Sequence, residues 1–116
     1  EVGLDLQSGE YLGRLDDVTG SVSPVVVSGF VYAVPVQEAF ELSSEVRDAF
    51  WFTLADLVDL KRHTQYRILH RGAERSVPAI DLLGPHRPIL WGLTYRFVAQ
   101  FLRLLGHQIP GGPPVG

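Results

Sequence analysis

The sequence predicts an α/β or α+β fold, in which strands come first and helices lie between and after them. Residues 25–34 are rich in β-branched and aromatic side chains, as strands are. Residues 66–70 and 76–80 flank a turn-forming stretch, residues 71–74, and together are typical of a hairpin. Apolar residues then recur at helical spacing over residues 90–105. Elements in this order predict a layered arrangement of strands and helices.

The composition is that of one globular domain. The chain has 116 residues, of which 46% are hydrophobic and 20% charged, so it can build a core and is not a disordered tail. A net charge of −3 argues against a general nucleic-acid or anionic-membrane binder, which would carry a basic field. The absence of cysteine excludes disulfides, zinc sites with thiolate ligands and thiol catalysis. We expect a soluble intracellular protein whose partners include neither nucleic acid nor a membrane.

The chain opens on Glu1 and contains no methionine, so we expect it to be a piece of a longer protein. Its most apolar run, residues 89–105, is interrupted by Arg96, Gln100 and Arg103. Because a membrane-spanning helix needs about 20 mostly apolar residues, this run predicts a buried or amphipathic helix.

The first half of the chain predicts several strands. Residues 9–18 alternate weakly between apolar and polar and predict a strand, and residues 19–24 have the composition of a loop. Residues 25–34 are apolar on both faces, which is typical of a central strand covered on both sides. Pro35 removes a backbone donor and ends this strand, and residues 36–42 are a candidate for a further one.

Short elements are predicted in the middle of the chain. Residues 43–46 predict a turn, and residues 49–52 predict a short strand. Thr53 is a good N-cap for a helix over residues 54–60, because its hydroxyl can accept a hydrogen bond from a free N–H group of the first turn. Residues 84–88 contain two prolines and a glycine and predict a loop.

The last predicted helix covers residues 90–105. Its apolar stripe and the residues that widen it are Leu90, Leu93, Phe97, Val98, Phe101, Leu102, Leu104 and Leu105. Arg96, Gln100 and Arg103 are expected on the opposite face. Gly106 is expected to end the helix, and residues 107–116 have the proline and glycine content of a flexible tail.

The residues alone offer few candidates for chemistry. No Ser/His/Asp order and no glycine-rich phosphate loop stands out, and most of the carboxylates are expected to be ordinary surface charges. The histidines at positions 63, 70, 86 and 107 do not have the spacing of metal ligands and predict solvated or loop residues.

Several segments of the chain nevertheless resemble the Nudix hydrolases. Residues 1–4 (EVGL) are similar to the end of the Nudix box, which closes on E-x-G and an aliphatic residue. Residues 45–57 (EVRDAFWFTLADL) resemble the family segment EVxEAxWVPLxEL. Residues 78–80 (PAI) and 89–94 (ILWGLT) resemble the C-terminal part of the coenzyme A pyrophosphatase branch, in which WGLT opens the last helix. In this order, the resemblance covers residues 1–106.

The resemblance implies a fold and an activity. The family fold is an α/β/α sandwich with a mixed sheet, so residues 1–106 would be the C-terminal portion of a single Nudix domain whose N-terminal part is missing from this chain. The branch cleaves the pyrophosphate of coenzyme A or its thioesters, giving adenosine 3′,5′-bisphosphate and a phosphopantetheine product. It uses Mg²⁺ or Mn²⁺, hard cations that prefer carboxylate oxygens and neutralise pyrophosphate charge.

The resemblance also suggests site residues. Glu1 would be the final glutamate of the box and a metal ligand, although the earlier box carboxylates are missing and one carboxylate is a poor metal site. Glu45 and Asp48 are candidates for a water-activating base, and the alternative is a solvated turn that caps the next strand. Arg14 could contact substrate phosphates. Trp91 could line the substrate pocket, or it could serve packing alone.

Three interpretations of the function stay open. The first is a metal-dependent hydrolase that acts on coenzyme A or another nucleoside-diphosphate-linked compound, with a homodimer as the candidate assembly. The second is a catalytically inactive module that keeps the Nudix fold for binding or assembly, since a fold does not guarantee its chemistry. The third is an unrelated α+β domain. If upstream strands are missing, the remaining sheet would expose apolar edges, so we expect this chain alone to be poorly soluble and inactive.

Overall fold

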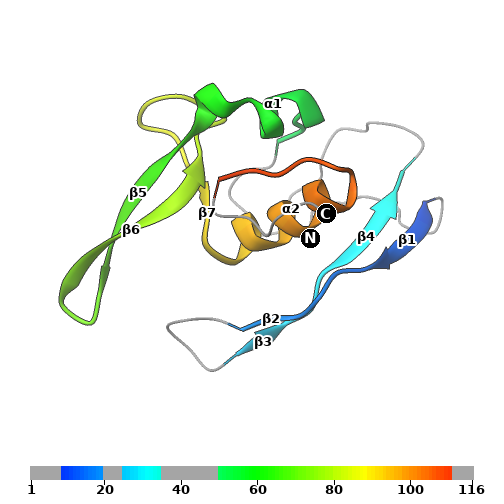
Figure 1. Cartoon of the computed structure of the whole chain (residues 1–116), viewed down its shortest axis with the longest axis horizontal. Helices are drawn as coiled ribbons and strands as arrows, with labels where there is room; N and C mark the ends of the chain where they lie inside the picture. The colour runs from blue at the N-terminus through cyan, green and yellow to red at the C-terminus, as the bar shows by residue number, and fades with distance from the viewer. Residues whose placement is uncertain (1–8, 20–24, 35–49, 111–116) are drawn as a thin grey trace. The chain divides into compact units, whose positions relative to one another are not determined.

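The computed structural model describes residues 9–19, 25–34 and 50–110, and combines helices with small sheets, as an α+β fold does (Figure 1). The chain divides into two compact units. The first unit comprises Glu1–Arg14 and Phe30–Phe52, and the second comprises Leu15–Gly29 and Thr53–Gly116. The predicted elements at residues 36–42 and 43–46 lie outside the described residues.

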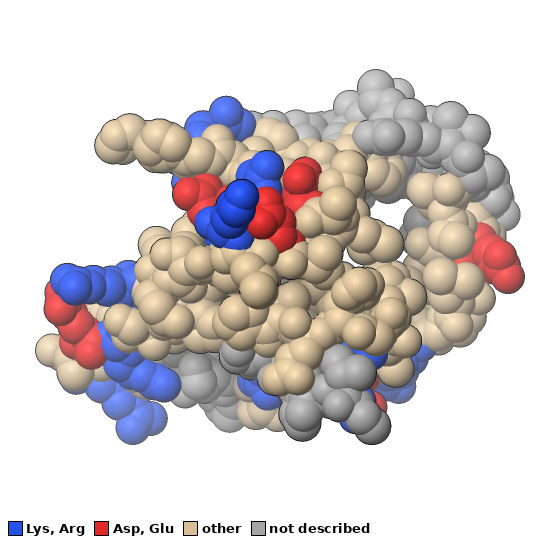
Figure 2. Space-filling model, turned by 45° about the horizontal axis from the view of Figure 1, so that its top comes forward, with Lys and Arg blue, Asp and Glu red and all other residues tan. Residues whose placement is uncertain are grey.

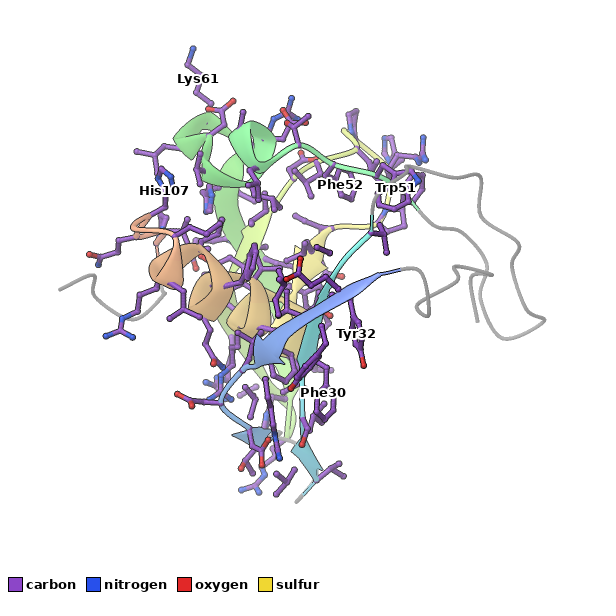
Figure 3. The ribbon with its side chains drawn as sticks, turned by 90° about the vertical axis from the view of Figure 1, so that its right-hand side faces the viewer. Phe30, Tyr32, Trp51, Phe52, Lys61 and His107 are labelled. Atoms are coloured by element: carbon purple, nitrogen blue, oxygen red, sulfur yellow. The ribbon has the colours of Figure 1, made fainter. Side chains whose placement is uncertain are left out.

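The first unit is built on two antiparallel strands, β1 (Glu10–Arg14) and β4 (Phe30–Ala33). Their register places Tyr11 opposite Tyr32, and the two rings lie 5.3 Å apart between centroids. Figure 3 shows Phe30 and Tyr32 projecting from β4. Phe30 lies 6.5 Å from Tyr11, and both Phe30 and Tyr32 are exposed. The unit therefore holds an aromatic cluster on a two-stranded ribbon.

The prediction of a covered central strand at residues 25–34 is wrong. The segment is split into β3 (Val26–Val27) and β4, each in a two-stranded sheet, and Val26 is 61% exposed. Ser28 and Gly29 separate the two strands: the Ser28 hydroxyl donates to Asp17 Oδ1, and the Gly29 carbonyl accepts from Leu15 N–H. Composition identified the strand tendency of this segment, but the neighbours of a strand depend on the rest of the chain.

The second unit contains the pair β2 (Val18–Thr19) and β3, which lies against helix α2 (Gly92–Leu104). Gln100 exchanges two hydrogen bonds with the backbone of Asp16, at 2.8 and 3.1 Å, and Arg96 donates to the Thr19 carbonyl at 3.0 Å. Two polar side chains of α2 thus bind the backbone just before β2 and at its last residue.

A three-stranded antiparallel sheet in the order β5-β6-β7 forms the other part of the second unit. The predicted hairpin is confirmed, with longer strands: β5 is His63–His70 and β6 is Ala73–Ile80. Only Arg71 and Gly72 connect them, at φ angles of 52° and 77°. Positive φ at both central residues is the geometry of a type I′ turn, whose twist matches that of the strands. The short edge strand β7 (Leu90–Trp91) pairs with Ala79 and Ile80.

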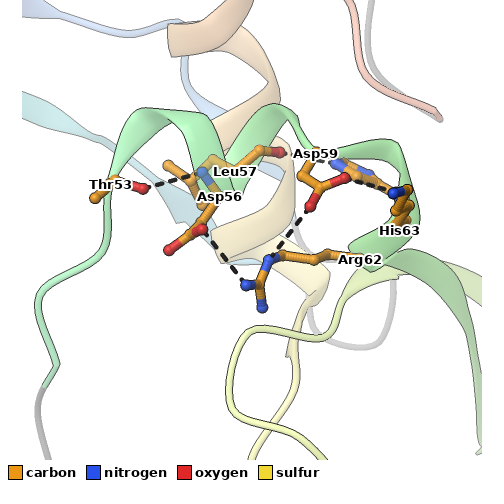
Figure 4. Close-up of polar contacts among 7 residues, drawn as sticks. Thr53, Asp56, Leu57, Asp59, Arg62 and His63 are labelled. Atoms are coloured by element: carbon orange, nitrogen blue, oxygen red, sulfur yellow. Dashed lines mark hydrogen bonds and ion pairs between the residues drawn. The ribbon is translucent and has the colours of Figure 1, made fainter.

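Helix α1 (Leu54–Val58) and the 3₁₀ turn η2 (Leu60–Arg62) lead into β5. The predicted N-cap is confirmed, because Thr53 Oγ1 accepts from Asp56 N–H at 3.1 Å (Figure 4). Asp59 Oδ1 caps η2 in the same way by accepting from Lys61 N–H at 3.0 Å. The predicted strand is wrong at residues 50–52, which have no regular structure.

Helix α2 begins two residues later than predicted, because Leu90 and Trp91 belong to β7. Gly92 makes the transition at a φ of 69°, where a side chain would be strained although nothing lies within 4 Å of its Cβ position. Gly106 ends the helix as predicted: Gly106 N–H donates to Arg103 O and His107 N–H to Leu102 O, the two bonds of a Schellman motif.

The core of the second unit lies to one side of the predicted stripe of α2 and takes in only part of the predicted set: Leu102 is buried, and Leu90 and Val98 pack against the core. Its buried members are Ile80, Tyr95, Ala99, Leu102 and Ile109. Leu104, which the periodicity placed in the stripe, is 71% exposed. The helix is apolar over most of its circumference, and the sheet with the C-terminal segment selects the face that is buried.

The packed part of the chain reaches Pro110. Ile109 is buried in the core, and the Tyr95 hydroxyl donates to the Pro110 carbonyl. Burial in this position raises the pKa of Tyr95. Within the described residues, none of the helices combines the length and the apolar character that crossing a membrane requires.

Candidate functional site

Two of the five site residues suggested by the sequence lie within the described structure. Glu1, Glu45 and Asp48 lie outside it. Arg14 is at the end of β1 in the first unit, with its guanidinium carbon 5.7 Å from the centroid of the Phe30 ring, in a cation–π contact. Trp91 lies in β7 of the second unit.

Trp91 lines an open pocket of about 470 Å³. This volume falls in the range of about 300–1,000 Å³ that is common for small-molecule sites. The pocket lies entirely in the second unit and is bordered by β5, β7 and the connection from β6 to β7. The residues that line it are Tyr66, Asp81, Gly84, Pro85, His86, Arg87, Pro88, Ile89 and Trp91.

One side of the pocket is aromatic. Thr64 and Trp91 both pair with Ala79, one from each side, so they share a face of the sheet. Because side chains alternate along a strand, Tyr66 lies on that face too. The Tyr66 and Trp91 rings lie 5.2 Å apart between centroids at an angle of 42°. They remain 37% and 39% exposed, so each ring has surface left for a ligand.

The other side of the pocket is a stiff loop. Asp81 Oδ1 accepts from Gly84 N–H at 2.9 Å, and Asp81 N–H donates to the Arg62 carbonyl at 2.8 Å, which fastens the start of the loop. Pro85 and Pro88 restrict the backbone on either side of two exposed residues, His86 and Arg87. His86 has a φ of 60°, a conformation that is uncommon outside glycine.

The charges of the pocket suit a ligand that carries both a flat ring and an anionic group. Arg87 supplies a guanidinium that can bind a phosphate or carboxylate through two parallel hydrogen bonds. Helix α2 starts directly after Trp91, and no side chain of the described residues caps it, so its N-terminus adds a partial positive charge nearby. The aromatic rings offer stacking surface.

A metal centre is not found within the described ranges. No three His, Cys, Asp or Glu side chains of residues 9–19, 25–34 and 50–110 gather to hold an ion. The suggested carboxylates Glu1, Glu45 and Asp48 lie outside these ranges, so the Mg²⁺ or Mn²⁺ site that the resemblance implies stays a prediction.

The acidic residues of α1 and η2 have a structural role. Arg62 lies 3.5 Å from Asp56 and 3.7 Å from Asp59, and Figure 2 shows acidic and basic side chains intermixed on the face that carries α1. His63 Nε2 is 2.8 Å from the Leu57 carbonyl, and its ring packs edge-on against Tyr95. The ion pairs thus tie η2 to α1, and His63 joins α1 to β5 and α2.

The sequence identified Trp91 as a candidate but missed Tyr66, His86 and Arg87. The available signal was the stretch of residues 84–88, where two consecutive basic or titratable side chains stand between prolines. The residues around Tyr66 in the sequence do not indicate a site, because Tyr66 comes close to Trp91 only through the pairing of β7 with β6.

In comparisons with known proteins, no family model, no curated protein and no solved structure matches this chain.

Proposed function

We propose that the natural protein containing this chain is a metal-dependent hydrolase of a nucleoside-diphosphate-linked compound, with coenzyme A or its thioesters as the first candidate substrate. The observation that carries the proposal is the pocket of the second unit, which offers stacking surface and a guanidinium to one ligand. Its Trp91 belongs to the WGLT segment that resembles the coenzyme A pyrophosphatase branch.

The chemistry of the ligand and the lining of the pocket are complementary. A nucleoside diphosphate carries a flat base and a chain of phosphates, and these are the two groups that an aromatic face and a guanidinium recognise. Coenzyme A adds a phosphate on the ribose, which gives Arg87 a further possible partner. The pocket thus supports a nucleotide ligand, whereas coenzyme A itself is favoured by the resemblance alone.

The residues that would act on the diphosphate are assigned by the resemblance. Glu1 would belong to the metal-binding glutamates, and Glu45 or Asp48 would activate the attacking water. Mg²⁺ or Mn²⁺, when bound, would neutralise charge on the diphosphate. Arg14 stays a candidate phosphate contact, with its guanidinium on the Phe30 ring.

The test is an assay of the natural protein with coenzyme A and Mg²⁺ or Mn²⁺, followed by chromatography for adenosine 3′,5′-bisphosphate. We expect this product to form, and Glu45→Gln to lower the rate by about 10²–10⁴-fold, as loss of a general base does. Glu74→Gln, on the exposed tip of the hairpin, is the matched control and should keep full activity. Absence of the product with both metals would reject the proposal for this substrate.

A catalytically inactive binding module is the second candidate. It is favoured by one observation: the pocket offers two aromatic rings and a guanidinium, groups that bind a ligand without carrying out a reaction on it. A ligand stabilises only a protein that binds it. If the module interpretation is correct, nucleotide raises the melting temperature of the natural protein, whereas Mg²⁺ and Mn²⁺ leave it unchanged. A clear rise with metal alone would contradict it.

A further inference from the structure

We propose that the pocket of Tyr66, His86, Arg87 and Trp91 binds the nucleotide half of the substrate, a base with its phosphate, without any metal. The proposal rests on the proposed function for the identity of the natural ligand, and it names which half of that ligand is recognised here. It is carried by three features of the second unit: an exposed ring, a stiff loop and a balanced charge.

The exposed ring is Trp91. It lies on the two-residue edge strand β7 and keeps 39% of its surface exposed, although it contacts Tyr66. The angle of 42° between the two rings means that Tyr66 does not cover the Trp91 face as a parallel partner would. A base stacked on this indole removes apolar surface from water and gains the contact energy of two flat rings.

The stiff loop presents His86 and Arg87 beside that ring. Pro85 and Pro88 flank the two residues, and the hydrogen bond from Gly84 N–H to Asp81 fixes the start of the loop. His86 holds a left-handed backbone conformation, at a φ of 60°, which costs free energy in any residue but glycine. A loop ordered in advance loses little entropy when a ligand binds.

The charge of the pocket predicts that a ligand needs both a base and a phosphate to bind tightly. Asp81 and Arg87 both line the pocket, so the lining contains one carboxylate and one guanidinium. Such a pocket does not attract a free anion strongly, because the two charges offset each other. We therefore expect inorganic phosphate alone and adenosine alone to bind far more weakly than adenosine monophosphate.

The experiment is calorimetric titration of the natural protein with adenosine monophosphate in the presence of EDTA. Trp91→Leu removes the stacking ring and Arg87→Gln removes the charge, and each should weaken binding by about tenfold or more. The matched controls are Trp51→Leu, outside the pocket, and Arg67→Gln, on the exposed hairpin, and both should bind within about twofold of the wild type. Arg87→Lys keeps the charge without the planar fork and should fall between.

The results separate this inference from the hydrolase proposal. Metal-free binding that depends on Trp91 and Arg87, in a protein that does not hydrolyse coenzyme A, supports the inference and rejects the hydrolase proposal for this substrate. Hydrolysis whose KM is unchanged in both pocket variants rejects the inference and leaves the hydrolase intact. Binding that requires Mg²⁺, or that weakens equally in the controls, also overturns the inference. If Trp91→Leu does not fold, the exposed-loop variant Arg87→Gln decides.

Discussion

Gly29 and Phe97 provide a direct test of how α2 packs in the second unit. A Cβ added at Gly29 would lie 2.9 Å from both Cδ1 and Cε1 of Phe97, closer than carbon atoms pack in proteins. Gly29 also accepts a hydrogen bond from Leu15, so the backbone cannot shift freely to relieve the clash. We expect Gly29→Ala to lower the free energy of unfolding by about 1–3 kcal/mol, the usual cost of overpacking.

A double-mutant cycle separates this clash from other effects of the alanine. Phe97→Leu removes the ring atoms that the new methyl group would meet, so Gly29→Ala should cost at least about 1 kcal/mol less in that background. The assay is denaturant unfolding of the four proteins, with the free energies compared at a common slope. Equal costs of Gly29→Ala in both backgrounds would refute the packing of α2 against this segment.

Three further predictions concern local interactions in the second unit. Thr53→Ala removes the N-cap of α1 and should lower the unfolding free energy by about 1 kcal/mol, measured by chemical denaturation, whereas Thr53→Ser should retain most of it. Gly72→Ala meets no neighbouring atom but takes a side chain to a φ of 77°, so it should lower the unfolding free energy by about 1–2 kcal/mol. Arg71→Asn suits a type I′ turn and should leave the unfolding free energy unchanged or raise it in the same assay. Since burial raises the pKa of Tyr95 in the folded state, its contribution to stability is complete below the unfolded pKa of about 10 and is lost as the pH rises through the folded pKa. Tyr95→Phe should therefore lower stability at neutral pH, through the lost bond to Pro110, and flatten the decline in alkali; an unchanged alkaline decline would contradict the assignment to Tyr95.

The elements that the sequence predicted well are those specified by neighbouring residues. The hairpin of β5 and β6, the Thr53 cap and the Gly106 stop each depend on a few consecutive side chains or on glycine's freedom of φ. The strand at residues 25–34 and the buried face of α2 depend instead on which distant segments pack against them. Ala99 is buried because of what lies opposite it, and its own hydrophobicity is too small to predict this.

The candidate site also depends mainly on contacts between segments that are distant in the sequence. Trp91 was identified through a family resemblance, which carries spatial information that a single sequence lacks. Tyr66 and Arg87 reach Trp91 only through the pairing of β7 with β6 and through the loop that connects those strands. A pocket built by strand pairing is therefore visible in the structure, although each of its residues looks ordinary in the sequence.

The two-residue turn at Arg71 and Gly72 has a consequence for the order in which this chain folds. Strands β5 and β6 are adjacent in sequence, so their pairing closes a very short loop and can proceed in about 1–10 μs. The pairing of β1 with β4 must wait until the chain has bridged the segment that includes β2 and β3. Helix α2 and the C-terminal segment share a core with Ile80 of β6, so we expect the hairpin to form first and the rest of the second unit to pack onto it.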